Sequence, residues 1–338
     1  MKESRRRIGY DIELILRRAE NDGVDNLNIA LRIDISSEIG TGHFLRMNAL
    51  ADGFLSLGHQ CVFLKGEDEP IDYSAYDIVV LDTYQINDDY IAELNSPARL
   101  LVCYDDNALY SYDCDVLINA NLYANELRFR FAKKTPILLL GGEYALLRRE
   151  FRESPPFLPQ EKASRIFICF GGSDARNSTH DVVCALREID GIQLDVVLGA
   201  YTKNDEEVLA LSGENVSIIK TPSAISEIMG NCDIAVTAAG SMVYELASIG
   251  IPSIIITQAD NQLLVAEYMA REGLMEYAGD WKSVDLGRLK NDAVSLLLDY
   301  GRRKVESARL IKTVNRNGAI DAAGKIIDFA QNKLSFNK

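Results

Sequence analysis

The sequence predicts an α/β protein with two doubly wound, parallel-sheet domains that face each other across a cleft. From residue 29 onward, short apolar runs rich in β-branched residues alternate with helical segments, as βαβ units require. A polar, proline-bearing stretch at residues 151–164 interrupts this alternation, which then resumes, so it is the expected linker. At 338 residues and 47% hydrophobic content, the chain can fill two cores.

The pattern divides the chain into an extension and two domains. Residues 1–28 carry apolar residues at helical spacing and are expected to form a helical N-terminal extension. Residues 29–150 and 165–333 are predicted to be the N-terminal and C-terminal domains. Strands are predicted at 29–35, 60–64, 77–82, 99–104, 115–118 and 136–139, then at 166–170, 194–198, 216–219, 233–237 and 253–256. Helices are predicted at 43–57, 87–94, 176–188, 223–230, 241–249 and 261–271, with a helical region at 284–333.

Composition excludes several classes of function. A formal net charge of −14 disfavours non-specific binding to nucleic acid or to an anionic membrane surface. No apolar run approaches the roughly 18 residues of a membrane span, so neither nucleic acid nor membrane insertion is expected. The six cysteines are scattered without a CxxC pair, which favours buried thiols over a zinc site. Since no signal peptide is recognisable, we predict a cytoplasmic location. We expect neither a metal nor a cofactor.

The first candidate site is the stretch Gly40-Thr41-Gly42-His43, which follows a predicted strand and opens a helix. Ligands of open α/β sheets bind outside the carboxyl ends of the strands. The third glycine of a dinucleotide fingerprint would fall at Leu45, so a nicotinamide site is not favoured. A helix N-terminus disfavours imidazolium, which makes His43 a candidate general base. A plain glycine turn would leave this histidine unexplained.

Two further candidates follow predicted strands. Asp82-Thr83-Tyr84 should line the same sheet edge as the histidine, although Asp82 serves equally well as an N-cap or turn residue. In the second domain, Gly171-Gly172-Ser173-Asp174 allows close approach of a ligand to the backbone and precedes a helix. An anion site is expected there, with capping of that helix by Asn177 or Thr179 as the alternative.

The strand ending near residue 237 is followed by Gly240 and Ser241. Ser241 is either a helix N-cap or a phosphate contact beside free backbone amides. Glu245 lies one residue beyond the capping-box position, so it is available to accept ribose hydroxyls. These residues predict a nucleotide site.

The last candidate is the stretch QADNQ at residues 258–262, directly after a strand. A row of amides, including those of Asn261 and Gln262, suits a sugar with hydroxyl or acetamido groups. An N-cap by Asp260 or Asn261 is the alternative, and it would leave the other amides unexplained.

Taken together, these motifs resemble those of GT-B nucleotide-sugar enzymes, whose two domains are Rossmann-like. The segments RIDISSEIGTGHFLRMNALA, GGSDARNST and AAGSMVYELASIGIPSIIITQADNQ are similar to motifs of the UDP-2,4-diacetamido-2,4,6-trideoxy-β-L-altropyranose hydrolase family of pseudaminic acid biosynthesis. The resemblance covers roughly residues 29–275.

This resemblance implies hydrolysis of a small-molecule UDP-sugar at its anomeric C–O bond, with inversion and without a metal. It implies that His43 positions or activates water, and that Tyr84 and Asn261 line the sugar site. It also implies that Ser241 and Glu245 contact the phosphate and the ribose. Two alternatives stay open: a glycosyltransferase of surface or spore-coat polysaccharide synthesis, and a nucleotide-sugar binding protein without activity.

Overall fold

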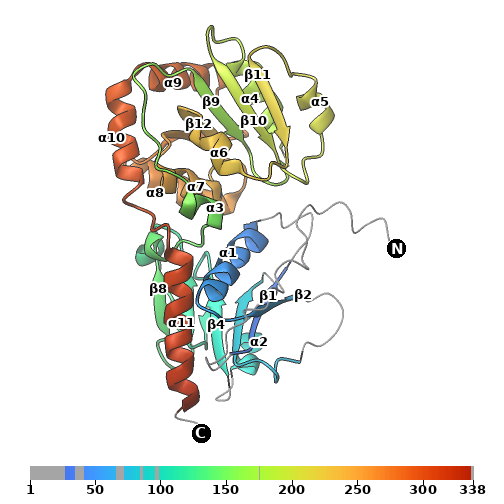
Figure 1. The fold of residues 1–338 in the computed structure, drawn as a ribbon, viewed down its shortest axis with the longest axis vertical. Coiled ribbons are helices and arrows are strands. Elements are labelled where there is room, and N and C mark those ends of the chain that lie inside the picture. The colour runs from blue at the N-terminus through green and yellow to red at the C-terminus, as the bar shows by residue number, and fades with distance from the viewer. Residues whose placement is uncertain are drawn as a thin grey trace. The chain divides into compact units, whose positions relative to one another are not determined.

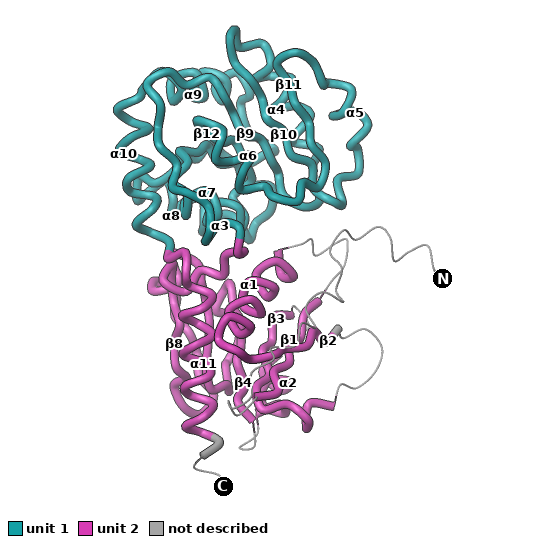
Figure 2. Tube along the Cα trace, viewed as in Figure 1, with its two compact units in different colours: residues 1–9, 150–314 teal, residues 10–149, 315–338 magenta. Residues whose placement is uncertain are grey.

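The chain folds into two compact units. The structure, a computed structural model, describes residues 27–34, 42–65, 72–83, 87–95, 99–174 and 176–335. Within these ranges, unit 1 comprises residues 150–314, and unit 2 comprises residues 27–149 and 315–335 (Figure 2). The expected helical extension at residues 1–28, apart from its last two residues, lies outside the described residues.

Unit 2 is built around a six-stranded parallel sheet (Figure 1). Its strand order is β2-β1-β3-β4-β6-β8. The strands are β1 (Ile29–Ile33), β2 (Cys61–Lys65), β3 (Ile78–Asp82), β4 (Leu100–Tyr104), β6 (Val116–Asn119) and β8 (Ile137–Leu140). The other elements are α1 (Gly42–Ser56), α2 (Asp88–Leu94), the paired β5 (Ser111–Tyr112) and β7 (Arg130–Phe131), the 3-10 turns η3 (Ala124–Glu126) and η4 (Gly142–Tyr144), and α11 (Gly318–Ser335).

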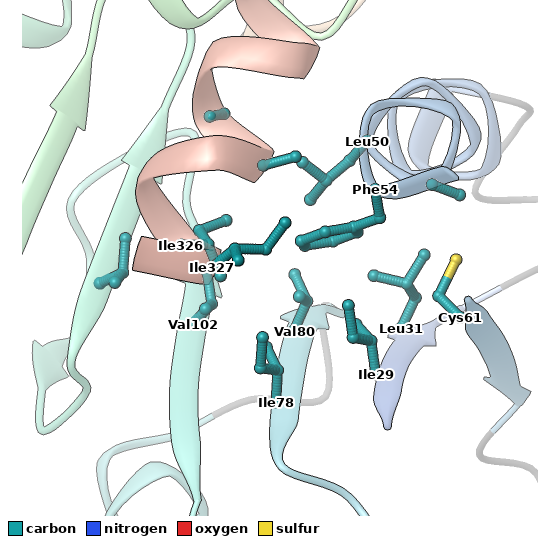
Figure 3. Packing of buried hydrophobic residues seen from close by; sticks show 14 of the residues in the cluster. Ile29, Leu31, Leu50, Phe54, Cys61, Ile78, Val80, Val102, Ile326 and Ile327 are labelled. Atoms are coloured by element: carbon teal, nitrogen blue, oxygen red, sulfur yellow. The ribbon is translucent and has the colours of Figure 1, made fainter. Parts of the chain in front are cut away.

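The central strands of this sheet are buried on both faces, as an almost uninterrupted apolar sequence requires. On one face, Leu50 and Phe54 of α1 meet Ile326 of α11 above the inward side chains of β1 and β3 (Figure 3). On the other face, a second cluster packs residues of the same strands against Ile91 of α2. Helices α1 and α11 approach closely at Gly53, where a Cβ would stand 2.4 Å from the carbonyl oxygen of Ala319.

The C-terminal helix corrects the predicted domain boundary. Residues 318–333 were expected in the C-terminal domain, but α11 packs in unit 2. Lys333 fixes its end, because its ammonium donates to the Asp115 carboxylate at 2.7 Å and to the Arg99 carbonyl at 2.6 Å. An amphipathic pattern shows that a helix needs an apolar partner, but it does not say which sheet supplies one.

The predicted linker at residues 151–164 is also part of a compact unit. After the short helix α3 (Arg149–Glu153), this stretch packs within unit 1. The backbone N–H of Phe157 donates to the Ile249 carbonyl at 2.8 Å, and the buried Arg303 donates to the Gln160 carbonyl at 2.7 Å. Such hydrogen bonds hold a polar, proline-bearing segment against the unit without regular secondary structure.

Unit 1 repeats the architecture with strand order β11-β10-β9-β12-β13-β14, again parallel. Its strands are β9 (Arg165–Cys169), β10 (Gln193–Leu198), β11 (Val216–Lys220), β12 (Ile234–Ala238), β13 (Ser253–Thr257) and β14 (Glu276–Asp280). Its helices are α4 (Ser178–Leu186), α5 (Asp205–Leu209), α6 (Ile225–Gly230), α7 (Met242–Ile249), η5 (Asp260–Gln262), α8 (Leu263–Arg271), α9 (Leu286–Leu298) and α10 (Tyr300–Leu310). The edge strand β14 and the short α5 were not predicted. None of the helices in the described ranges is long and apolar enough to cross a bilayer.

Each sheet has one point where the direction of winding reverses. In unit 2 the chain moves from β1 outward to β2, then returns to β3 on the other side of β1. In unit 1 the chain moves from β9 outward to β10 and β11, then returns to β12 on the other side of β9. Ligands of doubly wound sheets bind at the carboxyl ends of strands beside such a switch point. The fold therefore predicts that ligands bind at the loops after β1 and β3, and after β9 and β12.

Candidate functional site

A buried histidine–aspartate pair lies at the switch point of unit 2. His43 is the second residue of α1, and Asp82 ends β3. The Nδ1 atom of His43 and an Asp82 carboxylate oxygen are 2.7 Å apart, and both side chains are at most 5% exposed. Because an ionised carboxylate only accepts hydrogen bonds, we assign the proton between the two groups to Nδ1. The Nη2 atom of Arg46 lies 3.0 Å from the same nitrogen and donates to the same carboxylate oxygen. With this assignment, Nε2 is the ring atom that can accept a proton, as a general base requires.

Arg46, one turn further along α1, fixes the charge of this aspartate. Its Nε and Nη2 atoms donate to the two carboxylate oxygens of Asp82 at 2.7 and 2.5 Å. Its remaining nitrogen donates to Asp106 at 2.8 Å, and its guanidinium carbon lies 4.0 Å from the centre of the Tyr104 ring. Burial alone would raise the pKa of Asp82, but the charge and hydrogen bonds of Arg46 outweigh it and lower that pKa.

Polar residues at the next two strand ends extend the network. Asp105 and Asp106 follow β4, while Asn119 and Asn121 stand at the end of β6. Asp105 accepts hydrogen bonds from the Tyr112 hydroxyl and, at 3.2 Å, from the Asn119 amide. Asn121 reaches Asp106 at 3.3 Å. The sequence analysis did not select these residues. Asp105 and Asp106 are nevertheless polar residues directly after an apolar strand, the feature for which Asp82 was selected.

A further pair ties the two strands at the switch point together. The hydroxyl of Thr83, after β3, donates to the carboxylate of Asp34, after β1. Arg32 donates to the same carboxylate at 2.7 Å, and all three residues are buried. These contacts hold the ends of β1 and β3 together, and Asp82 is the last residue of β3.

The network borders a small pocket within unit 2. The space that the centres of water molecules can occupy in this pocket is about 50 Å³, so the pocket has room for a few water molecules. It is lined by His43, Arg46, Asp82, Thr83, Tyr104, Asp105, Asp106, Asn107, Leu109, Tyr110 and Tyr112. In the described part of the chain, no three His, Cys, Asp or Glu side chains are grouped so that they could hold a metal ion.

The remaining predicted residues of this unit are the two loop glycines and a tyrosine. Gly42 is the first residue of α1, and a Cβ placed on it would meet no described atom within 4 Å. Gly40 and Tyr84 lie outside the described residues. Of the predicted set, the structure thus brings His43 and Asp82 into direct contact.

In unit 1, the glycine loop after β9 is shaped by contacts within the chain. Gly171 has φ +81°, and the Gly172 carbonyl accepts a hydrogen bond from the Tyr201 N–H at 2.8 Å. A Cβ on Gly199, after β10, would stand 2.4 Å from the carbonyl oxygens of both loop glycines. Ser173 completes the turn, which therefore depends on a third glycine that the sequence analysis did not single out.

The residue that caps α4 is Asp174, not Asn177 or Thr179. Its carboxylate accepts hydrogen bonds from the N–H groups of Ser178 and Thr179, both at 2.9 Å. Gln258, after β13, reinforces this cap by donating to Asp174 at 3.0 Å. Asn177 adopts a left-handed conformation and makes no side-chain cap bond. Two amides that an anion would require are thus occupied by a carboxylate of the chain itself.

The loops after β12 and β13 lie together. Ser241 is exposed and makes no side-chain cap bond to α7, so capping does not account for it. Glu245, in the first turn of α7, is only 8% exposed. The amide nitrogen of Gln262 lies 3.8 Å from the position that a Cβ on Gly240 would occupy. Asn261 is exposed in η5 beside it.

Several solved structures that superpose on this chain are named as glycosyltransferases. MurG of Acinetobacter baumannii superposes with a TM-score of 0.59 at 14% identity, covering 89% of this chain and 99% of that one. The spinosyn rhamnosyltransferase SpnG, solved with thymidine diphosphate, gives a TM-score of 0.59 at 13% identity, covering 88% and 99%. The fold is therefore GT-B, as the sequence predicted.

The sequence relatives include a hydrolase of a UDP-sugar and a polysaccharide biosynthesis protein. An uncharacterized protein of Methanocaldococcus jannaschii is 25% identical over 89% of this chain and 69% of its own length. The UDP-2,4-diacetamido-2,4,6-trideoxy-β-L-altropyranose hydrolase of Campylobacter jejuni is 24% identical over 73% of this chain and 97% of its own. The spore coat polysaccharide biosynthesis protein SpsG of Bacillus subtilis is 21% identical over 73% and 82%. A family of unknown function, DUF354, matches residues 173–316. Together these likenesses support a relationship with GT-B nucleotide-sugar enzymes.

Proposed function

We propose that the protein hydrolyses the anomeric C–O bond of a UDP-sugar with inversion, releasing UDP and the free sugar. The substrate class is the UDP-2,4-diacetamido-2,4,6-trideoxyhexoses, and the reaction belongs to nonulosonic (pseudaminic) acid biosynthesis in the cytoplasm. The observation that carries the proposal is the buried pair of His43 and Asp82 beside a small pocket, in which a proton on Nδ1 would make Nε2 the acceptor. The likeness to the Campylobacter hydrolase supports it.

In this reaction, Nε2 of His43 takes a proton from water while the water oxygen bonds to the anomeric carbon. The electron pair of the breaking C–O bond leaves with the β-phosphate of UDP, and attack from the opposite face inverts the anomeric centre. Asp82 stabilises the imidazolium that forms, and Arg46 keeps Asp82 ionised. A general base of this kind contributes about 10²–10⁴-fold. UDP is a good leaving group, so the paired carboxylates of a glycosidase are not needed.

Unit 1 would hold the nucleotide at the start of α7. There the exposed Ser241 would contact phosphate beside backbone amides, and Glu245 would accept a ribose hydroxyl. The alternative helix start, at α4, already has two amides bonded to Asp174. The amides of Asn261 and Gln262 would bind the sugar.

Water is the attacking group in this proposal, and the pocket beside His43 has room for a few water molecules. A glycosyltransferase that activates an acceptor hydroxyl with the same histidine remains the second candidate, favoured by the likeness to the spore coat protein.

The proposal is tested by incubating the protein with a UDP-2,4-diacetamido-trideoxyhexose in the absence of any acceptor. We expect stoichiometric UDP and free sugar, with the inverted anomer seen first by proton NMR. UDP release that appears only after an acceptor is added would establish the transferase instead. Tight UDP binding without turnover of any UDP-sugar would point to the binding protein.

A further inference from the structure

One wall of the unit 2 pocket comes from a single segment, residues 105–110, between β4 and β5. Within it, Asn107, Leu109 and Tyr110 line the pocket. His43 and Asp82 line the same pocket from α1 and β3. The chemistry proposed above uses the histidine–aspartate side and gives no role to this segment.

The segment is held in one shape at a conformational cost. Ala108 has φ +54°, in the left-handed region that residues with a Cβ rarely adopt. The Asp105 carboxylate fastens this turn, because it accepts a hydrogen bond from the Ala108 N–H at 2.8 Å. Asp105 is itself buried and bonded to Tyr112 and Asn119. A strained backbone persists only where its surroundings fix it, and such strain gathers at ligand sites.

The side chains that this turn presents are of two kinds. Leu109 is 59% exposed although it lines the pocket, so it offers apolar surface there. Asn107, two residues earlier, offers an amide that both donates and accepts hydrogen bonds. An amide group next to a methyl group is the chemistry that matches this pair.

We propose that residues 105–110 determine the specificity for an N-acetyl substituent on the sugar. Asn107 hydrogen-bonds the amide of that substituent, and Leu109 covers its methyl group. This inference rests on the proposed function, since the sugar of the UDP-sugar must reach the pocket beside His43.

The test compares two nucleotides that differ in one substituent, UDP-N-acetylglucosamine and UDP-glucose. Their affinities are measured by titration calorimetry for the full chain and for Asn107→Ala and Leu109→Ser. The unmodified protein should prefer the acetamido nucleotide, and each variant should reduce this preference by about five- to tenfold. The affinity for UDP alone should not change. Leu57→Ser, which replaces another exposed leucine of unit 2 that does not line the pocket, is the matched control.

A preference that is absent in the unmodified protein, or unchanged in both variants, would overturn the inference. The proposed hydrolysis is judged separately, by UDP release. A protein that releases no UDP but shows the expected loss of preference would retain the specificity segment and lose the hydrolase assignment.

Discussion

The two units share a sheet topology, yet the carboxyl ends of their strands differ in chemistry. In unit 2, this edge carries ionised side chains in a buried network, with Arg46 bonded to both Asp82 and Asp106. In unit 1, it carries glycines, amides and a hydroxyl, and the carboxylate of Asp174 serves to cap a helix. Under the proposed function, the charge network of unit 2 would orient one proton acceptor, whereas the amides and glycines of unit 1 would form the surface that binds the nucleotide.

The largest effect is expected at His43, and it tests whether the two units have different roles. Replacing it with Asn removes the acceptor atom beside the pocket and should lower kcat by about 10²–10⁴-fold. The affinity for UDP should stay within twofold, because the nucleotide is assigned to unit 1. UDP release and calorimetric titration with UDP measure the two quantities. A variant that loses UDP binding but keeps kcat would reverse the roles of the units.

Arg46 is expected to act as a positioning residue. In Arg46→Met, the pKa of Asp82 should rise, because burial then acts without the opposing charge. Asp82 would become protonated at a higher pH, so the acid limb of the pH–kcat profile should move upward and kcat at neutral pH should fall by about tenfold or more.

Asp106→Asn is the matched control for this variant. It removes a partner of Arg46 but keeps the hydrogen bonds between Arg46 and Asp82. Its pH–kcat profile should therefore stay close to that of the unmodified protein. An acid limb that does not move in Arg46→Met, in a protein folded by circular dichroism, would contradict the positioning role.

Asp174 should matter for stability more than for binding. Asp174→Ala removes the acceptor for two amides of α4 and for Gln258, which should lower the free energy of unfolding by about 1–2 kcal/mol. Urea denaturation measures the change. The affinity of the folded variant for UDP should not fall, and a fall of tenfold would show that this loop binds the nucleotide.

Smaller effects are expected at the residues of unit 1 that are proposed to bind the nucleotide and the sugar. Ser241→Ala and Gln262→Ala should each raise KM by about five- to tenfold and leave kcat nearly unchanged, as the loss of one hydrogen bond with ligand does. Initial-rate kinetics provide the measurement. A selective loss of kcat in either variant would place this end in the chemical step.

The smallest effect concerns the fold alone. Burial lowers the pKa of His59, which is 2% exposed, below its ordinary value of 6.5. The unfolded chain therefore binds this proton at a higher pH than the folded one, so stability is complete above pH 6.5 and decreases as the pH falls through the folded-state pKa. His59→Phe should flatten this decrease in urea titrations without altering the pH–kcat profile. An equal pH dependence in both proteins would assign the decrease to other groups.

Local pattern was sufficient for much of the fold and for part of the site. Apolar runs such as Ile78–Asp82 are buried on both faces, so they are continuous in sequence and easily recognised. Parallel strands also bring their carboxyl ends to one edge, which is why His43 and Asp82 could be selected together although 39 positions separate them. The edge strand β14 escaped because Glu276–Asp280 is neither apolar nor β-branched.

The sequence by itself determined two doubly wound domains and the histidine and aspartate at one strand edge, because short-range periodicity and strand-end position express them. Only the tertiary structure decided that α11 completes unit 2, that Arg46 bridges Asp82 and Asp106, and that Asp174 caps α4. Each of these depends on which groups meet across long stretches of chain. Apolar faces and carboxylates can satisfy several partners equally well, and packing and desolvation select among them.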